Sequence, residues 1–262
     1  MSPTSRTKTP LVIAVLAVIG TVFVILPLAA LLVRAPWSNL ADELSSAGAW
    51  TALRLSIVVS LAAAALSLIL GAPVAWVLAR SALPARSFLR AIVILPLVLP
   101  PVVGGVGLLA ALGRGGIVGR WLDSIGIQLT FTIWGAVVAT TFVSIPLVIL
   151  AVESGLRSLD PRYERAASAM GASRTYVLRR VTLPLLRPHL AAGLVLAWAR
   201  ALGEFGATIT FAGNLAGRTQ TLPLAVYQTR QIDPGAAILI ALLLVALSLA
   251  VLVAMRDRIF AR

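Results

Sequence analysis

Residues 11–33 read LVIAVLAVIGTVFVILPLAALLV, an apolar stretch that contains no charged side chain. At about 1.5 Å per helical residue, a stretch of this length crosses the roughly 30 Å hydrocarbon core of a bilayer. Arg6 and Lys8 precede it, as basic residues precede the apolar core of a signal peptide. That core, however, has only about 7–15 residues. We therefore interpret the stretch as a retained first transmembrane helix.

The rest of the chain is also strongly apolar. Of its 262 residues, 60% are hydrophobic and 12% are charged, whereas about 25% of residues are charged in a soluble domain. A lipid-exposed backbone must satisfy its own hydrogen bonds, so every spanning stretch is predicted to be helical. The sequence predicts an all-α integral membrane protein with six transmembrane helices, at 11–33 and near 55–79, 91–112, 133–152, 190–213 and 236–255.

The basic residues predict how the chain is oriented. The formal net charge is +13, but the Lys and Arg residues are scattered between apolar stretches and form no single patch, which argues against nucleic-acid binding. Most of them flank the spans on the side that carries the longest loop, and such flanks stay in the cytoplasm. Both termini, 1–10 and 256–262, are therefore predicted to be cytoplasmic tails.

Several classes of site are excluded by composition. The chain has no Cys, and its one His, His189, is too little for a catalytic triad or a multi-histidine metal site. Gly113, Gly115 and Gly116 are not followed by the Gly-Lys-Ser/Thr of a phosphate-binding loop. We predict no catalytic residue, no metal site and no bound cofactor in this chain.

The third apolar stretch contains prolines and glycines that interrupt a helix. Pro96, Pro100 and Pro101 are followed by Gly104 and Gly105, so the span is predicted to be kinked or broken. Two interpretations stay open: an ordinary transmembrane kink, and a hinge or wall of a translocation path.

The longest predicted loop spans roughly residues 153–189, and its central part, 157–185, has the pattern of two short helices separated by a glycine. Asp160 and Pro161 are a typical helix start. Tyr163, Ala166, Ala167 and Met170 follow at helical spacing, which predicts that they share one face. Gly171 is predicted to end this helix in the left-handed conformation.

A second short helix is predicted to begin at Ser173 and to run to Val181. Leu183 and Pro184 are then predicted to turn the chain back toward the membrane. The alanine face of the first helix fits close docking of a partner protein, but an amphipathic helix on the anionic inner leaflet fits the pattern equally well.

The segments ERAASAMG at 164–171 and VTLP at 181–184 resemble the EAA loop of ABC importer permeases. The alanine pair, the glycine and the Leu-Pro pair have the family spacing, but Arg165 stands where the family has Glu, and the acid is Glu164. In that family the loop inserts a coupling helix into a separate ATPase subunit. The resemblance therefore assigns a coupling role to Tyr163, Glu164, Ala166, Ala167, Met170, Gly171, Leu183 and Pro184.

Two charged residues lie in the fifth apolar stretch. Arg200 and Glu204 are four residues apart, so they are predicted to meet on one helix face. They are interpreted either as a buried ion pair that fixes helix packing, or as a site where Arg200 lends positive potential to an anion path. Glu204 is also the only acid that the predicted boundaries place clearly inside a span.

The segment GEFGATI at 203–209 resembles the corresponding segment of molybdate permeases of the ModB type, whereas sulfate permeases usually have Ser-Val after the second glycine. The likeness extends over nearly all of the chain after residue 48 and implies a type I ABC permease domain at 48–255. It also implies a homodimer in the bacterial plasma membrane, two copies of an ATPase subunit that uses ATP and Mg, and an extracytoplasmic molybdate-binding protein.

The sequence leaves some alternatives open. Sulfate, thiosulfate and tungstate are oxyanions similar to molybdate, and a permease for any of them would fit the same pattern. A membrane scaffold without a transport role is an alternative of another class, against which the EAA loop argues. A secondary transporter would need coupling carboxylates within its spans.

Overall fold

The computed structural model describes residues 10–260, and every regular element in this part of the chain is helical. The longer helices are α1 (Leu11–Arg34), α3 (Ala47–Arg80), α7 (Ile133–Ser158), α10 (Leu183–Leu202) and α13 (Pro234–Phe260). The bent pair α4 (Arg86–Val98) and α5 (Pro101–Leu112) follows α3 and precedes α7 along the chain. The short elements are η1 (Trp37–Asn39), α2 (Leu40–Ser45), α6 (Gly119–Ser124), α8 (Pro161–Ala169), α9 (Arg174–Val177), η2 (Leu178–Thr182), α11 (Gly206–Phe211) and α12 (Leu222–Arg230).

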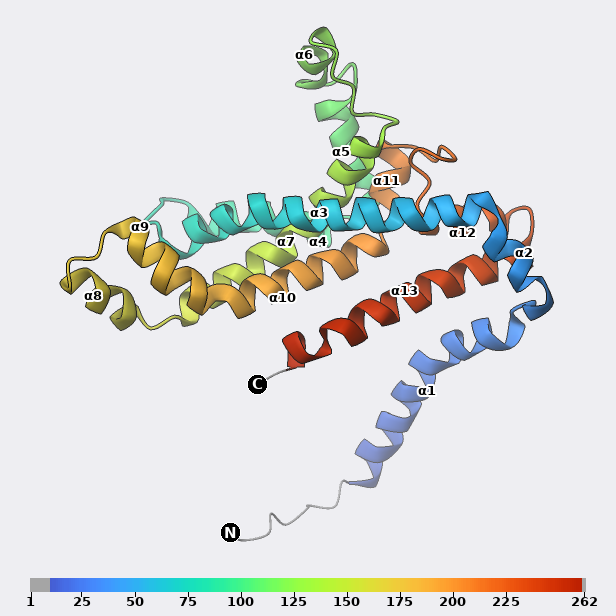
Figure 1. Ribbon diagram of the computed structural model, residues 1–262, viewed down its shortest axis with the longest axis horizontal. Coiled ribbons are helices and arrows are strands. Elements are labelled where there is room, and N and C mark those ends of the chain that lie inside the picture. The colour runs from blue at the N-terminus through green and yellow to red at the C-terminus, as the bar shows by residue number, and fades with distance from the viewer. Residues whose placement is uncertain (1–9, 261–262) are drawn as a thin grey trace.

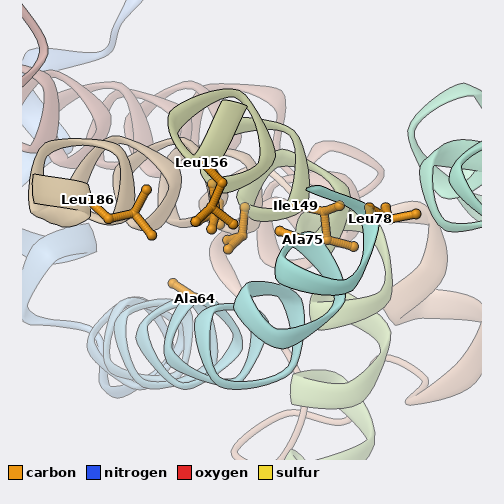
Figure 2. Packing of buried hydrophobic residues seen from close by; sticks show 9 residues of the cluster. Ala64, Ala75, Leu78, Ile149, Leu156 and Leu186 are labelled. Carbon is orange, nitrogen blue, oxygen red and sulfur yellow. The ribbon is translucent and has the colours of Figure 1, made fainter. Parts of the chain in front are cut away.

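Helices α3, α7 and α10 form the core of the molecule and lie side by side in Figure 1. Small residues let these helices approach closely, as is usual between helices in a bilayer. A Cβ at Gly193 of α10, for example, would lie 3.3 Å from the backbone of Val148 in α7. Figure 2 shows the buried cluster between the three helices, in which Ala64, Ala75, Leu78, Ile149, Leu156 and Leu186 are labelled.

The third apolar stretch is broken, which confirms the prediction of a kinked or broken helix. Helices α4 and α5 meet at an angle of 116°. Leu99 and Pro100 between them are extended, with ψ angles of 139° and 128°. Each of these residues precedes a proline, and a proline disfavours the helical conformation of the residue before it. In Figure 1, α5 projects from the three-helix core with α11 beside it.

The fifth apolar stretch differs from the prediction at both ends. Leu183 and Pro184 do not turn the chain, because α9, the π-helical η2 and α10 form one continuous helix from Arg174 to Leu202. Pro184 cannot donate to the carbonyl of Arg180, and the wider π-helical turn before it accommodates the missing bond. The helix then ends at Leu202, and α11 begins at Gly206, so the predicted span 190–213 is interrupted.

Among residues 10–260, five helices are long and apolar enough to cross a membrane, or six if the bent pair counts as one span. Helix α1 is the predicted first span, and none of its most apolar window is buried within the chain. The last helix continues to Phe260, so residues 256–260 of the predicted tail are helical. Residues 1–9, with Arg6 and Lys8, and residues 261–262 lie outside the described residues.

Candidate functional site

The loop between α7 and α10 has the local geometry that its sequence predicts. Oδ1 of Asp160 accepts a hydrogen bond from the backbone N–H of Arg162 at 2.9 Å, and Pro161 is the first residue of α8. Gly171 has a φ angle of +83°, which confirms the predicted left-handed conformation. Oγ of Ser173 accepts from the N–H of Tyr176 at 3.3 Å and caps α9.

Helix α8 presents an exposed face that is narrower than predicted. Tyr163 is 59% exposed, Met170 is 83% exposed, and Ala166 lies between them at the surface. Ala167 has the predicted helical spacing, but it is buried and is therefore not part of the exposed surface. Successive helical residues are 100° apart, so Ala167 lies at one edge of the stripe. There α9 and η2 pack against α8.

Glu164 lies away from the exposed face and joins three elements. Its Oε2 lies 3.1 Å from Nη1 of Arg80, the last residue of α3, and Nη2 of Arg80 donates to Oε1 at 3.1 Å. Oγ1 of Thr182, in η2, donates to the same Oε1 at 2.8 Å. The carboxylate therefore connects α8 to α3 and to the helix that continues into α10.

Arg200 and Glu204 form the predicted ion pair, with 2.7 Å between Nη1 and Oε2. The prediction of a shared helix face was wrong, because Glu204 lies beyond the end of α10, in the break before α11. The side chain of Glu204 is 1% exposed, and its Oε1 accepts from the backbone N–H of Ala207 at 2.8 Å. Glu204 therefore also satisfies a free N–H group at the start of α11.

A second buried acid escaped the prediction. Glu153 was expected to begin the loop, but α7 continues to Ser158, and the Glu153 side chain is 1% exposed. Its carboxylate pairs with Nε of Arg90 at 3.2 Å and with Arg157 one turn further along α7. The spacing of Glu153 and Arg157 was a visible signal, since oppositely charged residues four apart are neighbours on a helix.

Comparison with known proteins gives the family. Residues 68–261 match the family described as "Binding-protein-dependent transport system inner membrane component". The chain belongs to this family. It is therefore a permease subunit of a transport system, a multi-pass protein of the inner membrane and not itself an enzyme.

Relatives of this transport family differ in what their names say they carry. The chain is 45% identical to the "Molybdenum transport system permease protein ModB" of Mycobacterium tuberculosis, and the alignment covers 92% of each chain. It is 36% identical to the "Sulfate transport system permease protein CysT" of Salmonella typhimurium over 87% of this chain and 84% of that protein.

The fold is that of an ABC importer permease. A solved structure of a bacterial alginate ABC transporter, in complex with its pentasaccharide-bound periplasmic protein, contains a similar chain. The TM-score is 0.70 at 18% identity, and the match covers 95% of both chains. At this identity the likeness concerns the fold alone.

Proposed function

We propose that this chain is the permease subunit of an ATP-driven importer of molybdate. The observation that carries the proposal is the 45% identity to a molybdenum permease over 92% of the chain, against 36% to a sulfate permease over a shorter alignment. The Gly-Glu-Phe-Gly-Ala-Thr segment at 203–208 supports it, because Ala207 and Thr208 stand where sulfate permeases usually have Ser-Val. Both relatives are named for the transport of molybdenum or sulfate, which supports an oxyanion as the cargo.

In this proposal the loop between α7 and α10 faces the cytoplasm together with both termini, and the chain crosses the membrane six times. Two copies of the chain form the translocation path, two copies of an ATPase subunit bind below, and an extracytoplasmic binding protein delivers the anion. ATP and Mg belong to the ATPase, and this chain binds neither. The basic residues of the loop support the orientation.

The exposed face of α8 is the proposed contact with the ATPase. The surface here has two large exposed side chains, Tyr163 and Met170, and the small exposed residue Ala166 between them in the sequence. A partner protein therefore approaches the backbone of α8 closely at Ala166. Aromatic residues and Met, the types found at positions 163 and 170, are enriched in protein–protein interfaces. The caps at Asp160 and Ser173 and the turn at Gly171 fix where this face begins and ends.

The cargo is tested by reconstituting the chain with its ATPase and binding protein in vesicles. We expect molybdate to stimulate ATP hydrolysis and to accumulate inside, whereas sulfate or thiosulfate at the same concentration does neither. Tungstate, a dianion of similar size and shape, is expected to act like molybdate. Stimulation by sulfate and not by molybdate would replace the proposed cargo and leave the permease assignment intact.

The docking face is tested by Ala166→Trp, which places a large side chain at the centre of the contact. We expect the variant to insert into the membrane normally and to lose the ATPase in co-purification. Ile117→Trp is the matched control, because Ile117 is also exposed but lies in the loop between α5 and α6. Retention of the ATPase by Ala166→Trp would show that α8 is not its docking site.

A further inference from the structure

Three polar side chains join helix α8 to the core helices, and we infer that this Arg80–Glu164–Thr182 cluster transmits movement of α8 to α3 and α10. Glu164 is then a positioning residue and makes no direct contact with the ATPase. The inference rests on the proposed function, because α8 must receive a force from the ATPase for the cluster to pass it on. It goes further by naming the connection inside the permease.

The ion pair in the cluster has a directional geometry. Both terminal nitrogens of Arg80 lie 3.1 Å from the carboxylate of Glu164, each from a different oxygen. Two parallel contacts between a planar guanidinium and a carboxylate fix the relative orientation of the two groups as well as their distance. Arg80 also lies over the ring of Trp76, 5.9 Å from its centroid, on the same helix. The end of α3 is therefore held to α8 in one orientation.

The second connection leads to α10. Thr182 is buried, and its hydroxyl donates to Oε1 of Glu164 at 2.8 Å. This oxygen accepts from both Arg80 and Thr182, so one carboxylate holds two elements that are far apart in sequence. Thr182 belongs to the continuous helix from Arg174 to Leu202. A displacement of Glu164 therefore acts directly on the base of that helix.

Helix α8 has few other contacts that could hold it. Of its residues 161–169, Ala167 is the one that is buried, and a methyl group contributes little apolar contact. Tyr163 is exposed, and so is Met170, which directly follows α8. Because apolar packing is so small here, the polar cluster determines the orientation of α8 on the core.

The helices that the cluster holds also pack against each other. Leu78 near the end of α3 and Leu186 near the start of α10 belong to the buried cluster of Figure 2, together with Ile149 of α7. The far end of the continuous helix carries Arg200, whose partner Glu204 lies just beyond the last helical residue, Leu202. One continuous helix therefore links the Glu164 contact to the Arg200–Glu204 ion pair, about 27 Å away by helical rise from Thr182 to Arg200.

The test uses the reconstituted complex with its ATPase and binding protein, and the variant Glu164→Gln. We expect this variant to co-purify with as much ATPase as the unaltered chain, since the exposed face of α8 is unchanged. Stimulation of ATP hydrolysis by the molybdate-loaded binding protein is expected to fall about fivefold or more, the lower range of typical coupling between sites. Basal hydrolysis should persist.

Two further variants distinguish the cluster from a general effect of charge. Arg80→Gln is expected to reproduce the loss, whereas Arg86→Gln, the same change six residues further along, should leave stimulation unaltered. Arg86 has no ion pair among the described residues. The charge swap Arg80→Glu with Glu164→Arg restores the ion pair to α3 but removes the acceptor of the Thr182 hydroxyl, so we expect stimulation to recover only in part, and no recovery over Glu164→Gln would overturn the inference.

Failure of the inference and failure of the proposed function give different results. Full stimulation in Glu164→Gln, with the ATPase lost from Ala166→Trp, would overturn the inference and leave docking through α8 in place. Loss of the ATPase from Glu164→Gln would show that Glu164 serves docking or folding and would also overturn it. ATPase retained by Ala166→Trp would instead remove the docking proposal itself.

Discussion

The guanidinium of Arg200 lies 2.7 Å from the carboxylate of Glu204 across the end of a helix, since Arg200 is in α10 and Glu204 is in the break that follows. The second oxygen of the carboxylate accepts from the N–H of Ala207 at the start of α11. The pair therefore joins two helices and does not stabilise the surface of one. Glu204 is 1% exposed and Arg200 is 30% exposed. The charge of Glu204 therefore depends more on protein partners for its stabilisation, because water reaches Arg200 but not Glu204.

Loss of either charge is expected to damage folding or assembly more than the choice of ion. An unpaired buried charge costs about 3–5 kcal/mol, and we expect Arg200→Ala and Glu204→Ala to lower the yield of folded protein. Glu204→Gln should be milder than Glu204→Ala, because an amide oxygen still accepts from Ala207. Size-exclusion chromatography of the solubilised variants measures the folded fraction.

The double swap, Arg200→Glu with Glu204→Arg, is the control for charge. We expect only partial rescue, because an arginine at position 204 has no acceptor for the N–H of Ala207. A different result would favour the anion path: Arg200→Ala that expresses and assembles normally while molybdate uptake alone collapses would show that Arg200 serves the ion.

Gly155 of α7 is predicted to tolerate no side chain. A Cβ there would lie 2.7 Å from the Cβ of His189 in α10 and closer still to its ring. We expect Gly155→Ala to destabilise the protein by about 1–3 kcal/mol, as overpacking of a tight core does. Loss of monodisperse protein after heating in detergent measures the effect.

His189→Ala should suppress the defect of Gly155→Ala, because it removes the ring that the new methyl group meets. Gly48→Ala is the matched control, since a Cβ at Gly48 has no neighbour within 4 Å in the described part of the chain. If Gly155→Ala were as stable as Gly48→Ala, α7 and α10 would not pack as closely as the structure shows.

The purified chain is expected to hydrolyse no ATP by itself, because it has no phosphate-binding loop. Phosphate release should appear only after the ATPase subunit is added. Turnover that co-elutes with the chain through successive purification steps, and that survives removal of contaminating ATPases, would contradict the assignment as a permease subunit.

The features that depend on neighbouring residues could be predicted from the sequence. The caps at Asp160 and Ser173 and the left-handed Gly171 follow from rules that act over three or four positions, and the structure has all three. The apolar stretches likewise specify helices wherever lipid leaves the backbone no other partner. Pro100 and Pro101 specified the break between α4 and α5 in the same local way.

The features that depend on contacts between distant residues could not be predicted from the sequence. Glu164 contacts Arg80, which is 84 positions away in the sequence, and no local sequence pattern predicts this pair. The turn at Pro184 was wrongly predicted, because a π-helical segment before Pro184 lets the helix continue without the N–H that proline lacks. Whether such a segment forms depends on packing against other helices. Glu153 was placed in the loop because the hydrophobic pattern ends before it, although Arg90 of α4 pairs with it and keeps it buried.

Gly171 has the backbone conformation in the loop that is most sensitive to the type of residue. Its φ angle is +83°, and a Cβ placed there has no neighbour within 4 Å among the described residues. Substitution therefore strains the backbone without a steric clash. Gly171→Val should cost about 1–2 kcal/mol locally, because a Cβ is disfavoured in this conformation and β-branching makes it worse.

The strain of Gly171→Val is relieved most easily by re-orienting α8, whose apolar contact with the core is small. The variant should therefore insert into the membrane normally, while molybdate uptake falls sharply and ATP hydrolysis stops responding to the loaded binding protein. Gly171→Ala should be milder, and Gly171→Asn milder still, because Asn tolerates the left-handed region better. Uptake and stimulated hydrolysis measured on the three variants give this order. Normal coupled transport by Gly171→Val would mean that the direction of α8 does not depend on the left-handed turn, and the proposed geometry of coupling would be wrong.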